Sequence, residues 1–308
     1  MNTKTNIKLF LFSICLILIF SSNVFSNHVE YKKISFENIT LFSADKDQKV
    51  ARNIALQLDK DIQVFQKRIG TYLDGPIRVV IAPDHKEYLK WVGKHSKIME
   101  FSLAFYNNRN QTIYIKNPRE LKNLSALHRI LLHEYIHHFV NSFWKNPPLW
   151  FNEGMAVYFS GDMGIDREFN FVKNYILGNS RPLEMMKYGY PKNRIEWESF
   201  YAKSGLAVKY LYKQRRKEFY RLWDYALPER NFDSAFLKSF FFTPKDFSVF
   251  FEEYSKTHFR MEILLASTGI IWGVLPLVLI IGVIRKKIKS SKIKAQWEEE
   301  TEDLLESE

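Results

Sequence analysis

The spacing of hydrophobic residues changes along the first third of the chain. Residues 31–42 alternate loosely between apolar and polar side chains, which predicts a strand or a hairpin. Between Asp45 and Ile69 the apolar residues recur at intervals of four and three, which predicts an amphipathic helix that Gly70 ends. Ile77–Ala82 is a short β-branched run typical of a buried strand, and a helix is expected to follow it from about Asp84 to Val92.

The rest of the central region reads as a hairpin followed by helices. Phe101–Phe105 and Thr112–Ile115 flank the segment Asn107–Asn110, which predicts a hairpin turn. After this hairpin the apolar spacing is helical up to about residue 260. The pattern therefore predicts an α+β fold with a small N-terminal sheet and a mostly helical C-terminal part.

An apolar segment near the N-terminus has the features of a targeting sequence. Leu9–Phe20 carries no charge, two lysines precede it, and small residues follow it. Residues 1–26 are therefore predicted to be a signal peptide that is cleaved after Ser26. An uncleaved anchor is the alternative, because Val24 stands where a small residue is usual.

A second apolar segment lies near the C-terminus. Ile263–Ile284 contains no charged residue, and as a helix it would be about 33 Å long, enough for a hydrocarbon core of about 30 Å. The sequence therefore predicts a transmembrane helix over 261–284. Basic residues open the tail, 285–308, and predict that the tail is cytoplasmic. Residues 27–260 are then expected to form one domain outside the inner membrane of the cell, tethered by a single pass.

Composition limits the partners and the chemistry. The chain has 45 Lys and Arg against 34 Asp and Glu, and 46% of its residues are hydrophobic, which is typical of a globular protein and not of a disordered one. The basic charge favours acidic lipids, envelope polymers or acidic substrates, or else reflects a surface of scattered lysines. Nucleic acid is not expected as a partner, because no basic-aromatic motif is present. The single cysteine excludes a zinc site built on several thiolates.

The candidate chemistry lies in the motif His133-Glu134-Tyr135-Ile136-His137, inside a helix predicted from about Leu121 to Asn141. His133 and His137 are four residues apart, so their imidazoles project from one face and can share a cation. Glu134 is rotated away from that face and can reach a metal-bound water without being a ligand. His138 points about 100° away, so we expect it to lie behind the ligands or in solvent.

Glu153 is the predicted third ligand. Two prolines begin a second predicted helix, and Glu153 follows His137 by sixteen residues, so this helix can return antiparallel and aim its carboxylate at the same cation. Two histidines and one glutamate leave a fourth position for water, as in catalytic zinc sites. The alternative is that Glu153 is an exposed carboxylate in the first helical turn, where it would stabilise the helix dipole.

The two segments together resemble a known enzyme group. The motif at 133–137 followed by Trp150-Phe151-Asn152-Glu153-Gly154-x-Ala156 resembles the gluzincin zinc metallopeptidases, particularly the peptidase MA-like family. The order of predicted elements, with an edge strand just before the zinc helix, is also similar, and the likeness covers about Tyr31 to Tyr254. Val157 stands where thermolysin, a gluzincin, has an aspartate that steadies a zinc histidine. The sequence therefore assigns no residue to that supporting role.

The resemblance implies a zincin-like domain that hydrolyses peptide bonds in a peptide or protein substrate. His133, His137 and Glu153 would hold Zn²⁺, and Glu134 would act as the general base. Tyr201 would be the second donor to the oxyanion, unless it is a packing residue.

Two further expectations concern the substrate and the class of function. Thr112–Ile115 is a candidate edge strand for pairing with an extended peptide. The alternative function is a catalytically idle binding or scaffold module on the same fold, which would need the metal ligands but not Glu134. The presence of Glu134 favours the enzyme. The sequence gives no indication of the oligomeric state.

Overall fold

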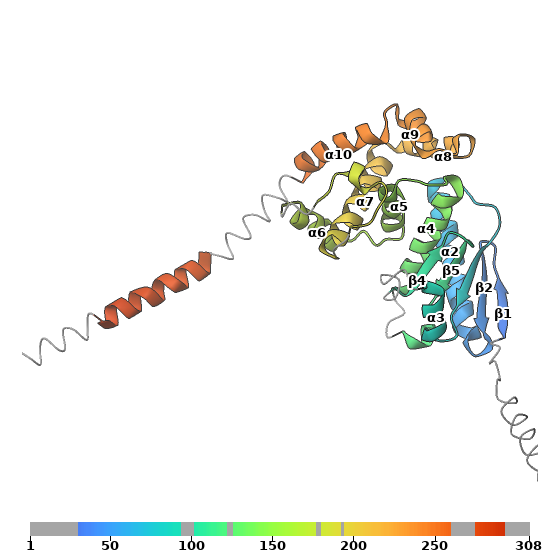
Figure 1. The fold of residues 1–308 in the computed structure, drawn as a ribbon, viewed down its shortest axis with the longest axis horizontal. Coiled ribbons are helices and arrows are strands. Elements are labelled where there is room, and N and C mark those ends of the chain that lie inside the picture. Colours follow the sequence, from blue (N-terminus) through green and yellow to red (C-terminus); the bar gives the residue numbers. More distant parts are fainter. Residues whose placement is uncertain are drawn as a thin grey trace, which may run out of the picture. The chain divides into compact units, whose positions relative to one another are not determined.

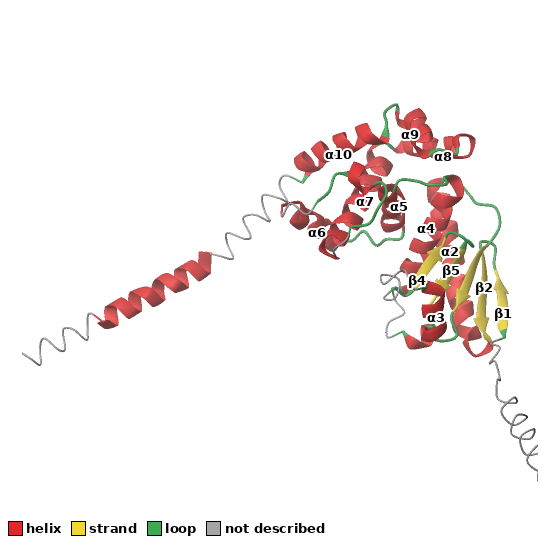
Figure 2. Ribbon diagram, in the orientation of Figure 1, coloured by secondary structure: helices red, strands yellow, loops and turns green. Residues whose placement is uncertain are grey.

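The structure, a computed structural model, describes residues 30–93, 102–121, 126–176, 180–191, 194–259 and 275–292. It is mostly helical with one small mixed sheet (Figure 1). The chain divides into two compact units, Met1–His138 and Phe139–Glu308, and every strand of the described residues belongs to the first (Figure 2).

The sheet of the first unit has five strands in the order β1-β2-β3-β5-β4. Their bounds are β1 (Tyr31–Ser35), β2 (Ile39–Ala44), β3 (Ile77–Ile81), β4 (Ala104–Asn107) and β5 (Thr112–Ile115). β2, β3 and β5 run parallel to one another, while β1 and β4 pair antiparallel at the two edges. The strands expected at 31–42, 77–82 and 112–115 are confirmed, and the first of them is the hairpin of β1 and β2. The strand expected at Phe101–Phe105 is found at Ala104–Asn107, and Phe101 lies outside the described residues.

The position of Thr112–Ile115 in this sheet differs from the prediction. β5 is not an edge strand, because it pairs with β3 on one side and with β4 on the other. Ile113 and Ile115 are completely buried, as expected for a strand inside a sheet. β4 comes earlier in the chain and takes the outer position, so the edge next to β5 is Ala104–Asn107.

Two helices of the first unit end where the sequence predicts, but the first begins at Gln48, because a 3-10 turn, η1 (Asp45–Asp47), occupies its predicted start. α2 (Gln48–Ile69) packs on β1 and β2, and Gly70 ends it with a left-handed φ of 78° and a hydrogen bond from its N–H to the Gln66 carbonyl. The short helix α3 (His85–Val92) packs on β5 and begins at Asp84, whose carboxylate accepts the N–H of Glu87. Glycine suits a positive φ, and aspartate suits the N-cap.

α4 (Leu127–Phe143) follows the sheet and carries the candidate motif. The rings of Tyr135 on α4 and Phe65 on α2 meet edge to face, with their centroids 6.2 Å apart, and Tyr135 is 2% exposed. Tyr135, the third residue of the motif, is therefore part of the core of the first unit.

The second unit is built from helices. They are α5 (Leu149–Phe159), α6 (Ile165–Ile176), the 3-10 turn η3 (Leu183–Met186), α7 (Arg194–Gln214), α8 (Arg216–Glu229), α9 (Phe232–Phe240) and α10 (Pro244–His258). α7 packs against both α5 and α6, and α8 packs against α9. Aromatic rings fill its centre, where the buried Trp144 contacts Phe151, Trp223 and Phe232.

The prediction of a transmembrane helix over 261–284 is corrected by the structure, and with it the predicted fold class. No helix among the described residues is long and apolar enough to cross a membrane. The helix described in this region spans 275–292, and basic residues occupy its second half from Arg285 onward. The fold class is therefore mostly helical with a small mixed sheet. Residues 261–274 and the predicted signal peptide, 1–26, lie outside the described residues.

Candidate metal centre

Two histidines one turn apart on α4 form the first part of the site. The ring centroids of His133 and His137 are 4.8 Å apart, and their planes are inclined at 80°. Both side chains are half-buried. The spacing of four residues thus places the imidazoles on one face of the helix, as the sequence predicts.

Glu153 on α5 completes the group. One nitrogen of His133, one nitrogen of His137 and one carboxylate oxygen of Glu153 lie within 4.8 Å of one another, so the three residues can hold a metal ion. Glu153 is only 2% exposed. The alternative in which it is an exposed first-turn carboxylate is therefore wrong.

The start of α5 and a glycine fix the place of Glu153. The Pro148 carbonyl accepts the N–H groups of Phe151 and Asn152, so the helix begins just before the ligand. At Gly154, a Cβ would lie 2.3 Å from the Ser204 carbonyl oxygen and 2.7 Å from Cγ2 of Val208. α5 therefore approaches the backbone of α7 at a distance that only glycine permits.

Glu134 lies next to the two histidines in the chain but does not belong to the ligand group. Its Oε2 accepts a hydrogen bond of 2.8 Å from the backbone N–H of Tyr106 on the edge strand β4. A backbone donor restricts the rotamer of this carboxylate without neutralising its charge. The sequence places Glu134 off the ligand face, and the structure adds the strand that holds it.

Of the two positions expected for His138, behind the ligands or in solvent, its half-buried side chain excludes the second. Its Nδ1 shares a hydrogen bond of 3.1 Å with the Tyr106 hydroxyl. Burial lowers the pKa of His138 to about 4, and burial also raises the pKa of Tyr106 to about 12. Both groups are therefore neutral at pH 7. The Tyr106 hydroxyl contacts His138 and the Tyr106 backbone N–H donates to Glu134, so Tyr106 links His138 to the candidate site.

A tyrosine that sequence analysis missed contacts the third ligand. The hydroxyl of Tyr190 donates a hydrogen bond to Oε1 of Glu153. The Tyr190 ring stacks on Trp197 with 5.1 Å between centroids and 13° between planes. No motif or spacing marks Tyr190 among the 16 tyrosines of the chain, because only the folded chain brings it to Glu153.

Tyr201, the predicted oxyanion donor, lies on α7. Its ring centroid is 5.9 Å from that of Trp197, and the guanidinium of Arg167 lies 5.7 Å above the ring. These contacts describe its packing, and its catalytic role stays a prediction.

Comparison with known proteins gives no family for this chain. No protein-family model matches it, and no curated protein matches it.

Proposed function

We propose that this protein is a zinc-dependent metallopeptidase. The observation that carries the proposal is the grouping of His133, His137 and the buried Glu153, with Glu134 held beside the two histidines but outside the ligand group. Zinc accepts imidazole nitrogen and carboxylate oxygen together, and three protein ligands leave a position for water. The likeness of both motifs to the gluzincin metallopeptidases supports the same conclusion.

Each residue has a distinct part in the proposed reaction. A bound zinc ion would lower the pKa of its water and polarise the scissile carbonyl. Glu134 accepts the proton of the attacking water and delivers it to the leaving amine. Its hydrogen bond from Tyr106 N–H keeps the carboxylate in one orientation during both transfers. Tyr201 is the proposed donor to the oxyanion.

The proposal is tested by peptide hydrolysis with a defined metal content. The full-length protein, loaded with zinc, is incubated with a mixed peptide library, and new termini are detected by mass spectrometry. We expect cleavage that a chelator abolishes and added zinc restores. Glu153→Ala is the matched inactive control, because it removes one ligand.

Two results would contradict the proposal. One is the absence of cleavage from protein that contains a full equivalent of zinc, which would favour an idle scaffold. The other is cleavage that persists unchanged in Glu153→Ala, which would assign the activity to a contaminant.

A further inference from the structure

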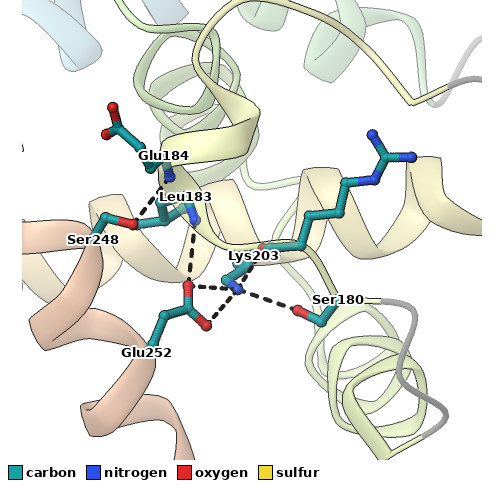
Figure 3. Close-up of polar contacts among 7 residues, drawn as sticks. Ser180, Leu183, Glu184, Lys203, Ser248 and Glu252 are labelled. Atoms are coloured by element: carbon teal, nitrogen blue, oxygen red, sulfur yellow. Dashed lines mark hydrogen bonds and ion pairs between the residues drawn. The ribbon is translucent and has the colours of Figure 1, made fainter. Parts of the chain in front are cut away.

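A buried lysine holds together several segments of the second unit. Lys203 on α7 is completely buried, and its ammonium contacts the two carboxylate oxygens of Glu252 on α10 at 2.7 and 2.8 Å. It also donates to the Arg181 carbonyl at 2.6 Å and to Oγ of Ser180 at 3.3 Å (Figure 3). All three ammonium donors therefore have acceptors, which suits a tether rather than a reactive amine.

The same network fixes the backbone that follows Ser180. Oε1 of Glu252 accepts the N–H of Leu183 at 3.3 Å, and Oγ of Ser248, one turn earlier on α10, accepts the N–H of Glu184 at 3.0 Å (Figure 3). Residues 180–184 are thus bound to α7 and α10 through buried or partly buried polar groups. Such groups cost energy unless they are paired, so the network specifies one position for this segment.

Further contacts continue this restraint as far as Tyr190. The Lys187 carbonyl accepts the N–H of Leu149, the first residue of α5, at 2.9 Å. The Trp197 indole N–H donates to the Pro191 carbonyl at 2.7 Å, and the same indole stacks on the Tyr190 ring. The segment 180–191 is therefore held along its length, and its Tyr190 hydroxyl donates to Glu153.

We infer that Tyr190 is a positioning residue for the metal ligand Glu153, carried by a segment that the Lys203–Glu252 pair anchors. The inference rests on the proposed metal-binding role of Glu153 but not on peptide hydrolysis. A hydrogen-bond donor beside a ligating carboxylate sets the orientation of its oxygens, and loss of such a partner typically weakens metal binding by about 10–100-fold.

The first test compares zinc affinity in two tyrosine variants of the full-length protein. Tyr190→Phe removes the hydroxyl and retains the ring on Trp197. We expect the zinc Kd, measured by competition with a chromophoric chelator, to rise by about 10–100-fold. The visible spectrum of the Co²⁺-loaded protein should shift as well, because the ligand field changes. Tyr188→Phe is the matched control, since Tyr188 is 86% exposed and close in the chain.

The second test asks whether Glu252 acts through Tyr190. Glu252→Gln keeps the shape of the side chain but weakens the bond to Lys203, so we expect a smaller rise in the zinc Kd than for Tyr190→Phe. In the Tyr190→Phe background, the same change should add little, because coupled residues are not additive. Glu253→Gln, whose carboxylate is exposed and pairs only with Lys256 among the ion pairs described, is the control on the same helix.

The outcomes separate this inference from the proposed function. A wild-type zinc Kd and an unchanged Co²⁺ spectrum in Tyr190→Phe would overturn the role of Tyr190. Fully additive effects in the double variant would overturn the anchoring by Glu252. If the wild type binds zinc but cleaves no peptide, the proposed function fails and the inference stands. If the wild type binds no zinc, both fail.

Discussion

The metal centre depends on single side chains whose neighbours restrict them. Glu153 is almost fully buried, and a buried carboxylate is costly unless hydrogen bonds or a cation compensate its charge. Tyr190 supplies one hydrogen bond to it, and Tyr106 supplies one to Glu134 through its backbone. The ligand and the proposed base are thus oriented by different parts of the fold, so substitutions should separate their roles.

Zinc content should distinguish the ligands from the base. His133→Ala and Glu153→Ala each remove one of three protein ligands, so dialysed protein should lose its single zinc. Glu134→Gln should retain about one equivalent, because Glu134 is not in the ligand group. Elemental analysis of folded variants measures this directly. A full equivalent of zinc in Glu153→Ala would remove Glu153 from the site.

Which of these residues can be predicted from the sequence depends on how far apart in the chain the contacting residues lie. His133 and His137 share a helix, so their spacing alone predicts that they meet. Glu153 is on the next helix, and the short loop between the helices together with the likeness to the gluzincin motif is enough to predict it as the third ligand. Tyr106 and Tyr190 contact the site only through the sheet edge and the segment 180–191, and no local pattern encodes those placements.

At the scale of elements, α5 and α7 approach each other closely where they cross. Two glycines lie there: a Cβ at Gly154 would meet the Ser204 carbonyl, and one at Gly205 would lie 2.9 Å from Sδ of Met163 and 3.0 Å from Cγ1 of Val157. The Ser204 carbonyl is backbone and cannot rotate away as a side chain can. The position of Glu153 therefore depends on the residue that follows it.

Gly154→Ala should lower the free energy of unfolding by about 1–3 kcal/mol, as overpacking in a close-packed interior does. Alanine has the better helix propensity, so any loss of stability comes from the clash. Urea unfolding measures the difference. Gly164→Ala is the control, because a Cβ there meets nothing within 4 Å and its φ is not left-handed. A Gly154→Ala protein as stable as wild type would contradict the close approach.

The sheet shows what periodicity leaves undetermined. Alternation and β-branched runs locate the strands, but they do not order them. Both strands of the hairpin before α4 carry buried residues, and β5 takes the inner place because it pairs in parallel with β3 along Arg78–Ile81. The sequence predicted the hairpin correctly and assigned the edge to the wrong strand.

At the scale of the whole molecule, zinc binding should stabilise the fold, because the ligands come from two helices. At free zinc about 100 times the Kd, the expected gain is about 2.7 kcal/mol. Thermal unfolding with zinc and with a chelator measures it, and Glu153→Ala should show no zinc dependence. Identical melting of the wild type in both conditions would indicate that the three ligands do not bind the ion together.

The C-terminal region illustrates a whole-chain prediction that failed. A hydropathy argument counts consecutive apolar residues, and 263–284 contains no charge. The part of this region that the structure describes, 275–292, is a helix that includes Arg285 and four lysines. The described helix therefore includes charged residues beyond the apolar run, and no helix among the described residues is long and apolar enough to cross a membrane.

The most direct test of the proposed peptidase is the turnover of Glu134→Gln at equal zinc content. The amide keeps the shape of the carboxylate but cannot take the proton of the attacking water, so kcat/KM should fall by about 10²–10⁴-fold on a peptide that the wild type cleaves. Glu120→Gln, a substitution of an exposed glutamate in the first unit, should retain wild-type turnover. Undiminished hydrolysis by zinc-loaded Glu134→Gln would contradict the assignment of Glu134 as the base and the mechanism proposed with it.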